Sequence, residues 1–389
     1  MKRRDFLKLS VLTPAFIQTA CKQANDVNFV AGNEKSFDFL EVRGSYYDIG
    51  FQIGSFFGKN IKAVIKERPG WIENLLEIVA KPEGRAFADE LYNNVKKFFP
   101  HMYEELEGMA AGAKMDFEII KLMSINSELN VFEKENPGCS TIFYKDNKHI
   151  WHFHNEDGHM AYSNRMFVLK AHPPSGVSYI SFVYPGMITG VGPSINSRGI
   201  ILTTNYIASL NPAPGIPRYF LGRAILEAKS IDEAYQFASK TPRAFPWHHN
   251  ILSVKDQKYM SVETLPEGTV NKYEPNGFYL HTNHPIGDLT KDYAYQNLEY
   301  KKSSSVSRYE VLERKIEASG GTVVKPETVL GWLSSHENKP YSPCRHPEGN
   351  VTGATLGTAF FDVKKGILRL YKGNPCKAVP NRLFTEYRV

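Results

Sequence analysis

The chain has 389 residues, enough for one large domain or two ordinary ones, and 42% of them are hydrophobic, which suits a globular protein with a sizeable core. Only 23% are charged, so the composition excludes an intrinsically disordered chain. The formal net charge is +6, and half of it belongs to residues 1–21, so the rest is too weakly basic to predict a nucleic-acid partner.

Residues 1–21 are typical of an export signal. A basic patch with paired arginines precedes the apolar residues 9–17, which are too few to span a bilayer as a permanent helix. The arginine pair resembles a twin-arginine signal, and the Thr-Ala-Cys that ends at Cys21 resembles a lipoprotein cleavage box, although Gln18 stands where an apolar residue is usual. We expect a bacterial exported protein, either periplasmic or anchored to the membrane by a lipid on Cys21, with residues 22–36 as a polar tether. The alternative is a merely basic N-terminus.

The segment 37–138 is predicted to be mostly helical. Apolar residues recur at helical spacing over residues 48–68, 85–111 and 117–129. After residue 138 the pattern changes to short runs of β-branched and aromatic residues separated by turn signals. These runs predict strands at 141–145, 149–155, 178–184, 199–206, 251–254, 259–263 and 278–282.

Helical patterns return at 219–229, 231–240, 306–318 and 326–335. A closing hairpin is predicted over Thr358–Tyr371, with its turn at residues 364–366. Antiparallel strands with helices gathered in separate runs predict an α+β layered domain, because the alternation of a doubly wound sheet is missing.

Cys139 follows a Pro-Gly turn and begins a predicted strand. If the Gly138–Cys139 bond is cut, Cys139 carries both a nucleophilic sulfur and a free α-amine. The α-amine has a reference pKa of about 8, so it can serve as the general base. This arrangement predicts an enzyme that acts on an acyl group. The alternative is that Cys139 is a small buried hydrophobic residue.

The motifs of this chain, taken in order, resemble the N-terminal-nucleophile amide hydrolases of the peptidase C45 group, which contains the acyl-CoA:6-aminopenicillanic acid acyltransferases. The main matches are Gly-Phe-Gln-Ile-Gly at 50–54, Gly-Cys-Ser-Thr at 138–141, Asn-Glu-Asp at 155–157, Thr-Asn at 204–205, His-Thr-Asn-His at 281–284, Ser-Arg-Tyr at 307–309, Cys-Arg-His-Pro at 344–347 and Gly-Asn-Pro-Cys at 373–376. The resemblance implies a four-layer αββα sandwich, made as a precursor that cuts itself before the cysteine and needs no cofactor.

The resemblance also implies roles for five residues. Cys139 would be the nucleophile, Asp157 would hold the new α-amine, and Asn205 would supply an oxyanion donor. Asn283 and Arg308 would complete the polar shell. Chemistry supports these roles in part, because a carboxylate can orient an amine and one donor aimed at an oxyanion is typically worth about 3–4 kcal/mol of barrier. Ordinary roles in turns, caps or surfaces are the alternatives for the four polar residues.

The histidines His152, His154 and His159 suggest a second enzyme, a zinc-dependent hydrolase. The metallo-β-lactamase spacing would place Asp at 156 and His at 157, where this chain has Glu and Asp, so no metal is predicted. His154 also stands where bile-salt hydrolases often have arginine, so a bile-salt substrate is not expected. A third possibility is a non-catalytic envelope lipoprotein with the same fold.

We therefore expect a self-processed cysteine amidohydrolase or acyltransferase that acts on N-acyl amides or acyl thioesters through an acyl-enzyme on Cys139. Its partners would be a small-molecule substrate and its own processed segment 37–138, which would stay bound to the catalytic segment 139–389. Cys344 and Cys376 either pair as a disulfide or remain two buried thiols.

Overall fold

The computed structural model describes residues 28–30, 37–129, 138–209, 211–296, 303–323 and 325–388. The predicted export signal, with Cys21, lies outside these residues. Within the predicted tether, β1 (Asn28–Val30) pairs antiparallel with β15 (Phe384–Arg388). Among the helices of the described part, none has the length and apolar character needed to cross a bilayer.

Two β-sheets form the centre of the molecule. Across the first sheet the strands are β1, β15, β14 (Ile367–Lys372), β13 (Gly353–Asp362), β4 (Ile150–His159), β3 (Cys139–Lys145) and β12 (Phe278–His281). Across the second they are β11 (Val270–Tyr273), β10 (Lys258–Thr264), β9 (Trp247–Ser253), β8 (Ile200–Tyr206), β7 (Ser194–Asn196), β6 (Tyr179–Val183), β5 (Phe167–His172) and β2 (Asp38–Arg43). Among the described strands of these two sheets, every pairing is antiparallel except that of β2 with β5.

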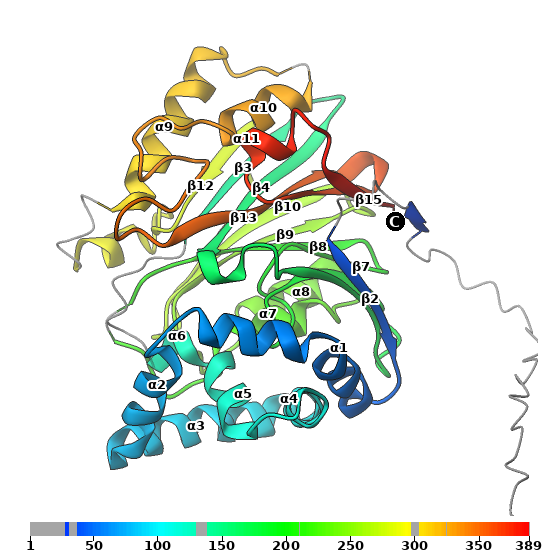
Figure 1. Ribbon diagram of the computed structural model, residues 1–389. Helices are drawn as coiled ribbons and strands as arrows, with labels where there is room; N and C mark the ends of the chain where they lie inside the picture. The colour runs from blue at the N-terminus through cyan, green and yellow to red at the C-terminus, as the bar shows by residue number, and fades with distance from the viewer. Residues whose placement is uncertain are drawn as a thin grey trace, which may run out of the picture.

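Helices cover the outer face of each sheet (Figure 1). Beside the first sheet lie α9 (Ser304–Ala318), α10 (Pro326–Leu333) and α11 (Pro375–Ala378). On the side of the second sheet lie α1 (Tyr46–Lys66), α2 (Trp71–Ala80), α3 (Pro82–Phe98), α4 (Pro100–Ala113), α5 (Phe117–Ser124), α6 (Asn126–Leu129), α7 (Arg218–Ile225) and α8 (Ile231–Ala238). The predicted α+β, four-layer αββα sandwich is confirmed.

The N-terminal segment is mostly helical, as predicted, with four differences. The pattern over 117–129 forms α5 and α6 instead of one helix. The pattern over 85–111 forms two helices, because Pro100 has no N–H to continue α3 and instead begins α4. Helix α2 and strand β2 were not predicted. The closing hairpin is confirmed, and Gly366 takes the left-handed conformation (φ 59°) that its turn requires.

Two glycines explain how tightly α1 packs on α4. A Cβ on Gly50 would lie 1.8 Å from the carbonyl oxygen of Glu105, and one on Gly54 would lie 2.1 Å from that of Met109. Any side chain at these positions would push the helices apart. The Gly-Phe-Gln-Ile-Gly motif therefore serves close helix packing, away from the chemistry.

Buried ion pairs tie the N-terminal helices to the rest of the domain. Arg223 of α7 binds Glu105 of α4 at 2.9 Å, and both side chains are inaccessible to solvent. Arg223 also binds Glu227 at 2.6 Å, and Glu227 accepts a hydrogen bond from Tyr46 of α1. Together with the pairing of β2 and β5, these contacts make segment 37–129 part of one folded unit.

Candidate active site

Cys139 is the first residue of β3 and is only 6% exposed. Its main-chain N–H donates to Asn283 Oδ1 at 2.9 Å, and its thiol lies 3.9 Å from Glu156 Oε1. Glu156 is directly opposite Cys139 in the β3–β4 pair, so their side chains point to the same face of the sheet. The sulfur therefore faces the space between the two sheets.

Arg308, on α9, fixes the main chain around Cys139 from the other face. Its Nη1 donates to the Cys139 carbonyl oxygen at 2.5 Å and to Ser140 Oγ at 2.9 Å. Its Nη2 donates to Asn283 Oδ1 at 2.6 Å, while Asn283 Nδ2 donates to the Tyr206 carbonyl at 2.9 Å. Two donors at Oδ1 and an acceptor at Nδ2 fix the orientation of the Asn283 amide. A fully buried guanidinium is thus held against the peptide that follows the predicted cleavage site.

Gly138 lies against two guanidinium groups. A methyl group on Gly138 would lie 2.7 Å from Arg308 Nη2 and 3.0 Å from Arg345 Nη1. A side chain at this position would therefore have to displace the Arg308 guanidinium. The predicted scissile bond, Gly138–Cys139, has positive charge on one side and a buried thiol on the other.

The uncut chain holds the Cys139 thiol protonated. Burial raises its pKa well above the usual value, and the nearby carboxylates of Glu156 and Asp157 raise it further. The Asp157 N–H and the charge of Arg308 act in the opposite direction but are weaker. A thiol in this state needs a base before it can attack a carbonyl.

Asp157 lies on the face of β4 opposite to the Cys139 side chain. Its Oδ1 accepts a hydrogen bond from Thr355 Oγ1 at 2.7 Å, and its buried Oδ2 has no hydrogen-bond partner among the described residues. Burial raises the Asp157 pKa to about 6, against the lowering effect of Arg345 and Arg308. In this uncut chain the Cys139 nitrogen is hydrogen-bonded to Asn283, so a role of Asp157 toward a free α-amine stays a prediction.

Asn205, on β8, presents an amide whose oxygen is fully used. Its Oδ1 accepts from Asn250 Nδ2 at 2.9 Å and lies 3.0 Å from Thr141 Oγ1 and 3.1 Å from His248 Nδ1. Its buried Nδ2 has no hydrogen-bond partner among the described residues. Thr141 follows Cys139 by two positions on the same face of β3. A fixed amide with an unused N–H near the nucleophile is suited to bind an oxyanion.

The predicted histidine trio does not form one metal-binding group. His152 contacts Thr203 Oγ1 at 2.8 Å, and His159 accepts from the Ala161 N–H at 3.1 Å. Only His154 belongs, with Cys139 and Glu156, to a group whose potential ligand atoms lie within 4.8 Å of one another. His154 Nε2 is 3.2 Å from Glu156 Oε2.

A second hydrogen-bond network positions Asn283. The Glu263 carboxylate binds His281 Nε2 at 2.8 Å, the Ile286 N–H at 2.8 Å and the Thr290 hydroxyl. This fixes the loop after β12, which carries Asn283. His281, two residues before Asn283 in the sequence, therefore has a structural role.

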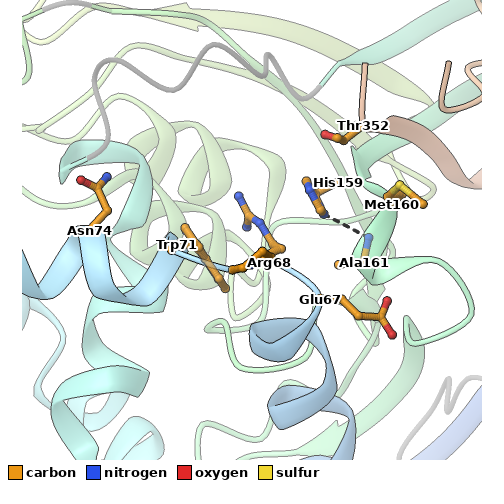
Figure 2. A pocket seen from close by; sticks show the side chains of 10 residues that line it. Glu67, Arg68, Trp71, Asn74, His159, Met160, Ala161 and Thr352 are labelled. Atoms are coloured by element: carbon orange, nitrogen blue, oxygen red, sulfur yellow. Dashed lines mark hydrogen bonds between the residues drawn. The ribbon is translucent and has the colours of Figure 1, made fainter. Parts of the chain in front are cut away.

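A cavity of about 770 Å³ opens beside this end of β4 (Figure 2). It is lined by Glu67, Arg68, Pro69, Gly70, Trp71, Asn74, His159, Met160, Ala161 and Thr352. The Arg68 guanidinium stacks 3.9 Å from the Trp71 ring centroid. His159 is two residues beyond Asp157 on β4, so the cavity lies at the end of the strand that carries Glu156 and Asp157. It has both an aromatic wall and charged groups.

Three of the sequence-predicted residues, Cys139, Asn283 and Arg308, are in direct contact. Asp157 reaches the thiol through its main-chain N–H, and Asn205 joins the group through Thr141. The sequence did not predict that Glu156 lies beside the Cys139 sulfur, or that Arg345 lies beside Gly138. The hairpin register, counted outward from the turn at Asp146, could have identified Glu156.

Comparison with known proteins matches residues 143–377 to the family described as acyl-coenzyme A:6-aminopenicillanic acid acyl-transferase. A beta-alanyl-dopamine/carcinine hydrolase of Drosophila melanogaster is 25% identical over 383 residues, covering 88% of this chain and 94% of that protein. The 40 kDa form of the acyl-coenzyme A:6-aminopenicillanic-acid-acyltransferase of Emericella nidulans is 25% identical over 345 residues, covering 86% and 93%. Among solved structures, a Caenorhabditis elegans ortholog of N-acylethanolamine-hydrolyzing acid amidase aligns with a TM-score of 0.40 and 14% identity, covering 64% of this chain and 100% of that chain.

Proposed function

Since the match covers more than half of its length, this chain belongs to the acyl-coenzyme A:6-aminopenicillanic acid acyl-transferase family, and we propose that it is a self-cleaving cysteine amidohydrolase or acyltransferase with Cys139 as nucleophile. The observation that carries the proposal is the setting of Cys139. The thiol, its own main-chain nitrogen and the Gly138 peptide are held in one buried site by Glu156, Asn283 and Arg308.

The first step would be self-cleavage. The thiol gives its proton to a base, for which Glu156 Oε1 is the nearest described carboxylate oxygen, and the sulfur attacks the Gly138 carbonyl carbon. The C–N bond then breaks, the nitrogen of Cys139 leaves as an α-amine, and Gly138 is left as a thioester on the sulfur. Water hydrolyses that thioester to a Gly138 carboxylate and a free thiol.

Turnover would use the group that cleavage creates. The α-amine takes the thiol proton while the sulfur attacks the substrate carbonyl, and Asn205 Nδ2 stabilises the oxyanion. The leaving amine takes the proton and an acyl-enzyme remains on Cys139. Water or an amine then releases the acyl group, giving hydrolysis or transfer.

The relatives suggest the substrate class. One is named as a hydrolase of beta-alanyl-dopamine and carcinine, the other as an acyltransferase that uses an acyl-coenzyme A. We propose that this chain takes a small N-acyl amide or acyl thioester, with part of the molecule in the cavity between Trp71 and His159. Incubating the matured protein with an N-acyl amine, with and without a second amine, separates hydrolysis from transfer by the products formed.

We also propose that residues 1–21 direct export and that Cys21 receives a lipid. The basic, short apolar layout supports this proposal. Mass spectrometry of the protein from a bacterial membrane fraction tests it. A mature chain without the added mass of a lipid at Cys21 would refute the anchor, and an unprocessed Met1 start would refute export through this signal.

Intact mass and N-terminal sequencing of the purified protein test the central proposal. We expect two chains, one ending at Gly138 and one beginning at Cys139, with Cys139→Ala remaining a single inactive chain. Activity in an uncut wild-type chain would refute the mechanism. Activity that survives Cys139→Ala but is lost with a chelator would favour the zinc hydrolase, and an uncut chain without thiol reactivity would favour a binding protein.

A further inference from the structure

Four metal-binding side chains converge beside the outer face of the first sheet, the face that points away from the second sheet. They are His336, just beyond α10, Cys344 and His346 in the loop before β13, and Cys376 in α11. One potential ligand atom from each lies within 4.8 Å of the other three. We call these four residues the cysteine–histidine cluster.

Distances within the cysteine–histidine cluster are those of a coordination shell. His346 Nε2 lies 3.5 Å from Cys344 Sγ and 3.5 Å from Cys376 Sγ. Zinc–sulfur bonds of about 2.3 Å and zinc–nitrogen bonds of about 2.0–2.1 Å, at tetrahedral angles, place sulfur and nitrogen roughly 3.6 Å apart. The observed separations leave the ligands where a tetrahedral ion would need them. The rings of His336 and His346 approach to 5.1 Å at 71°, so both can direct a nitrogen toward one point.

The ligand set favours zinc. Two thiols and two imidazoles are one of the usual ligand sets of structural zinc sites, whereas calcium and magnesium prefer oxygen. Asn374 Nδ2 lies 3.7 Å from Cys344 Sγ, and such a donor stabilises a thiolate ligand from outside the coordination shell. We propose that His336, Cys344, His346 and Cys376 bind one structural Zn²⁺ ion.

Burial in the cysteine–histidine cluster is graded. Cys344 is fully buried, His346 and Cys376 are half-buried, and His336 is exposed. The exposed histidine provides a route by which the ion reaches the inner ligands, as a metal site needs. Both cysteines are free thiols in this structure. His346 Nε2 lies close to both sulfurs, which a shared metal ion requires and a disulfide does not.

A zinc ion here would fix the loop that carries Arg345. This residue directly follows Cys344, its N–H donates to Thr355 Oγ1 at 2.9 Å, and its carbonyl oxygen accepts from Asn374 Nδ2 at 2.6 Å. The same Thr355 hydroxyl binds Asp157, and the Arg345 guanidinium lies next to Gly138. The ion would connect α10, the loop and α11, and so hold one side of the proposed cleavage site.

Metal analysis of the purified chain tests the proposal. We expect about one zinc ion per wild-type chain after zinc loading and desalting, and background levels in Cys376→Ser and His346→Ala. His149→Ala, which removes a histidine outside the cluster, should keep its zinc. Cys139→Ala should also keep it, which excludes binding at Cys139, His154 and Glu156. Wild-type protein that stays metal-free would overturn the proposal. Loss of zinc in the Cys139→Ala variant would overturn it as well.

Two further measurements remain informative even if the variants fold poorly. Cobalt(II) loading of the wild-type protein should give the sulfur-to-metal charge-transfer and visible ligand-field bands of a tetrahedral thiolate site. Thiol titration of the denatured, unreduced chain should find Cys344 and Cys376 both free once the metal is chelated. A disulfide between them in freshly prepared protein would refute a zinc site. Neither result depends on self-cleavage, so failure here and failure of the proposed enzyme are distinguishable.

Discussion

Replacing Gly138 by alanine tests the proposed cleavage at a residue that itself supplies no group to turnover. The new methyl carbon would lie 2.7 Å from Arg308 Nη2, whereas ordinary contact begins at 3.4 Å, so the guanidinium would have to retreat by about 0.7 Å. It cannot do so freely, because it is bonded to Cys139, Ser140, Asn283 and Ser304. Relief of the clash therefore either weakens these hydrogen bonds, which orient the peptide of Cys139, or moves the scissile carbonyl.

Displacement of a reacting carbon by about 1 Å can cost roughly 100-fold in rate. We therefore expect the cleavage rate of Gly138→Ala to fall by about two orders of magnitude, followed as conversion of the precursor band over time. The matched control is Gly331→Ala in α10, where the added methyl group meets nothing within 4 Å and the backbone is helical.

Measuring substrate turnover distinguishes a specific effect of Gly138→Ala on cleavage from general damage to the active site. Residue 138 ends the first chain after cleavage, so the fraction of Gly138→Ala that matures should show kcat/KM close to that of the wild type, per molecule of free Cys139 α-amine. Cleavage of Gly138→Ala at the wild-type rate would refute the proposed position of the scissile bond. An equal loss in both steps would show that the methyl group distorts the whole site.

Three further predictions test separate parts of the site. Asn205→Ala should lower kcat by roughly 10²–10³, because it removes the proposed oxyanion donor, and unchanged kcat in a folded variant would exclude that role. Trp71→Ala should raise KM about 10-fold with little change in kcat if the cavity holds a part of the substrate away from the reacting carbonyl. As the control, a truncated substrate that lacks this part should give the same steady-state kinetics with the variant and the wild type. Asp157 has a pKa raised to about 6 in the folded chain, so its protonation stabilises the fold at low pH and this contribution is lost as the pH rises through 6. The test compares Asp157→Asn with Asp157 in the uncut Cys139→Ala background, by urea denaturation. From pH 4 to pH 7 the unfolding free energy of the Asp157 protein should fall by roughly 2 kcal/mol relative to that of the Asp157→Asn protein. A difference that does not change with pH would contradict the raised pKa.

Much of this architecture was predictable from local pattern. The change from helical spacing to short β-branched runs at residue 138 marks the boundary at which β3 begins. The order of the motifs around Cys139, Asn283 and Arg308 identified three residues that are in contact although 144 positions separate the first two. These three assignments rest on the family resemblance, because no local signal pairs residues so far apart in the sequence.

Registers and long-range partners were not predictable in the same way. The second strand was predicted to begin at residue 149, and pairing it with residue 145 would place Cys139 opposite Asn155. The observed pairing of Lys145 with Ile150 places it opposite Glu156. A slip of one residue exchanges the two faces of a strand, so the carboxylate beside the sulfur depends on that single count. Arg345 lies more than 200 residues from Gly138, and no local pattern indicates that they meet.

Cleavage would create a second proton acceptor beside the thiol, the α-amine of Cys139. As an amide, the Cys139 nitrogen cannot accept a proton, and burial keeps the thiol protonated. As an amine it would stay beside Asn283 Oδ1, where two opposing charges act on it. The Asp157 carboxylate favours the ammonium form, whereas the Arg308 cation, bonded to the same Asn283 oxygen, favours the neutral amine that serves as a base. Because scission of the Gly138–Cys139 bond supplies the α-amine that accepts the thiol proton in turnover, the precursor should be inactive towards substrate until it is cut.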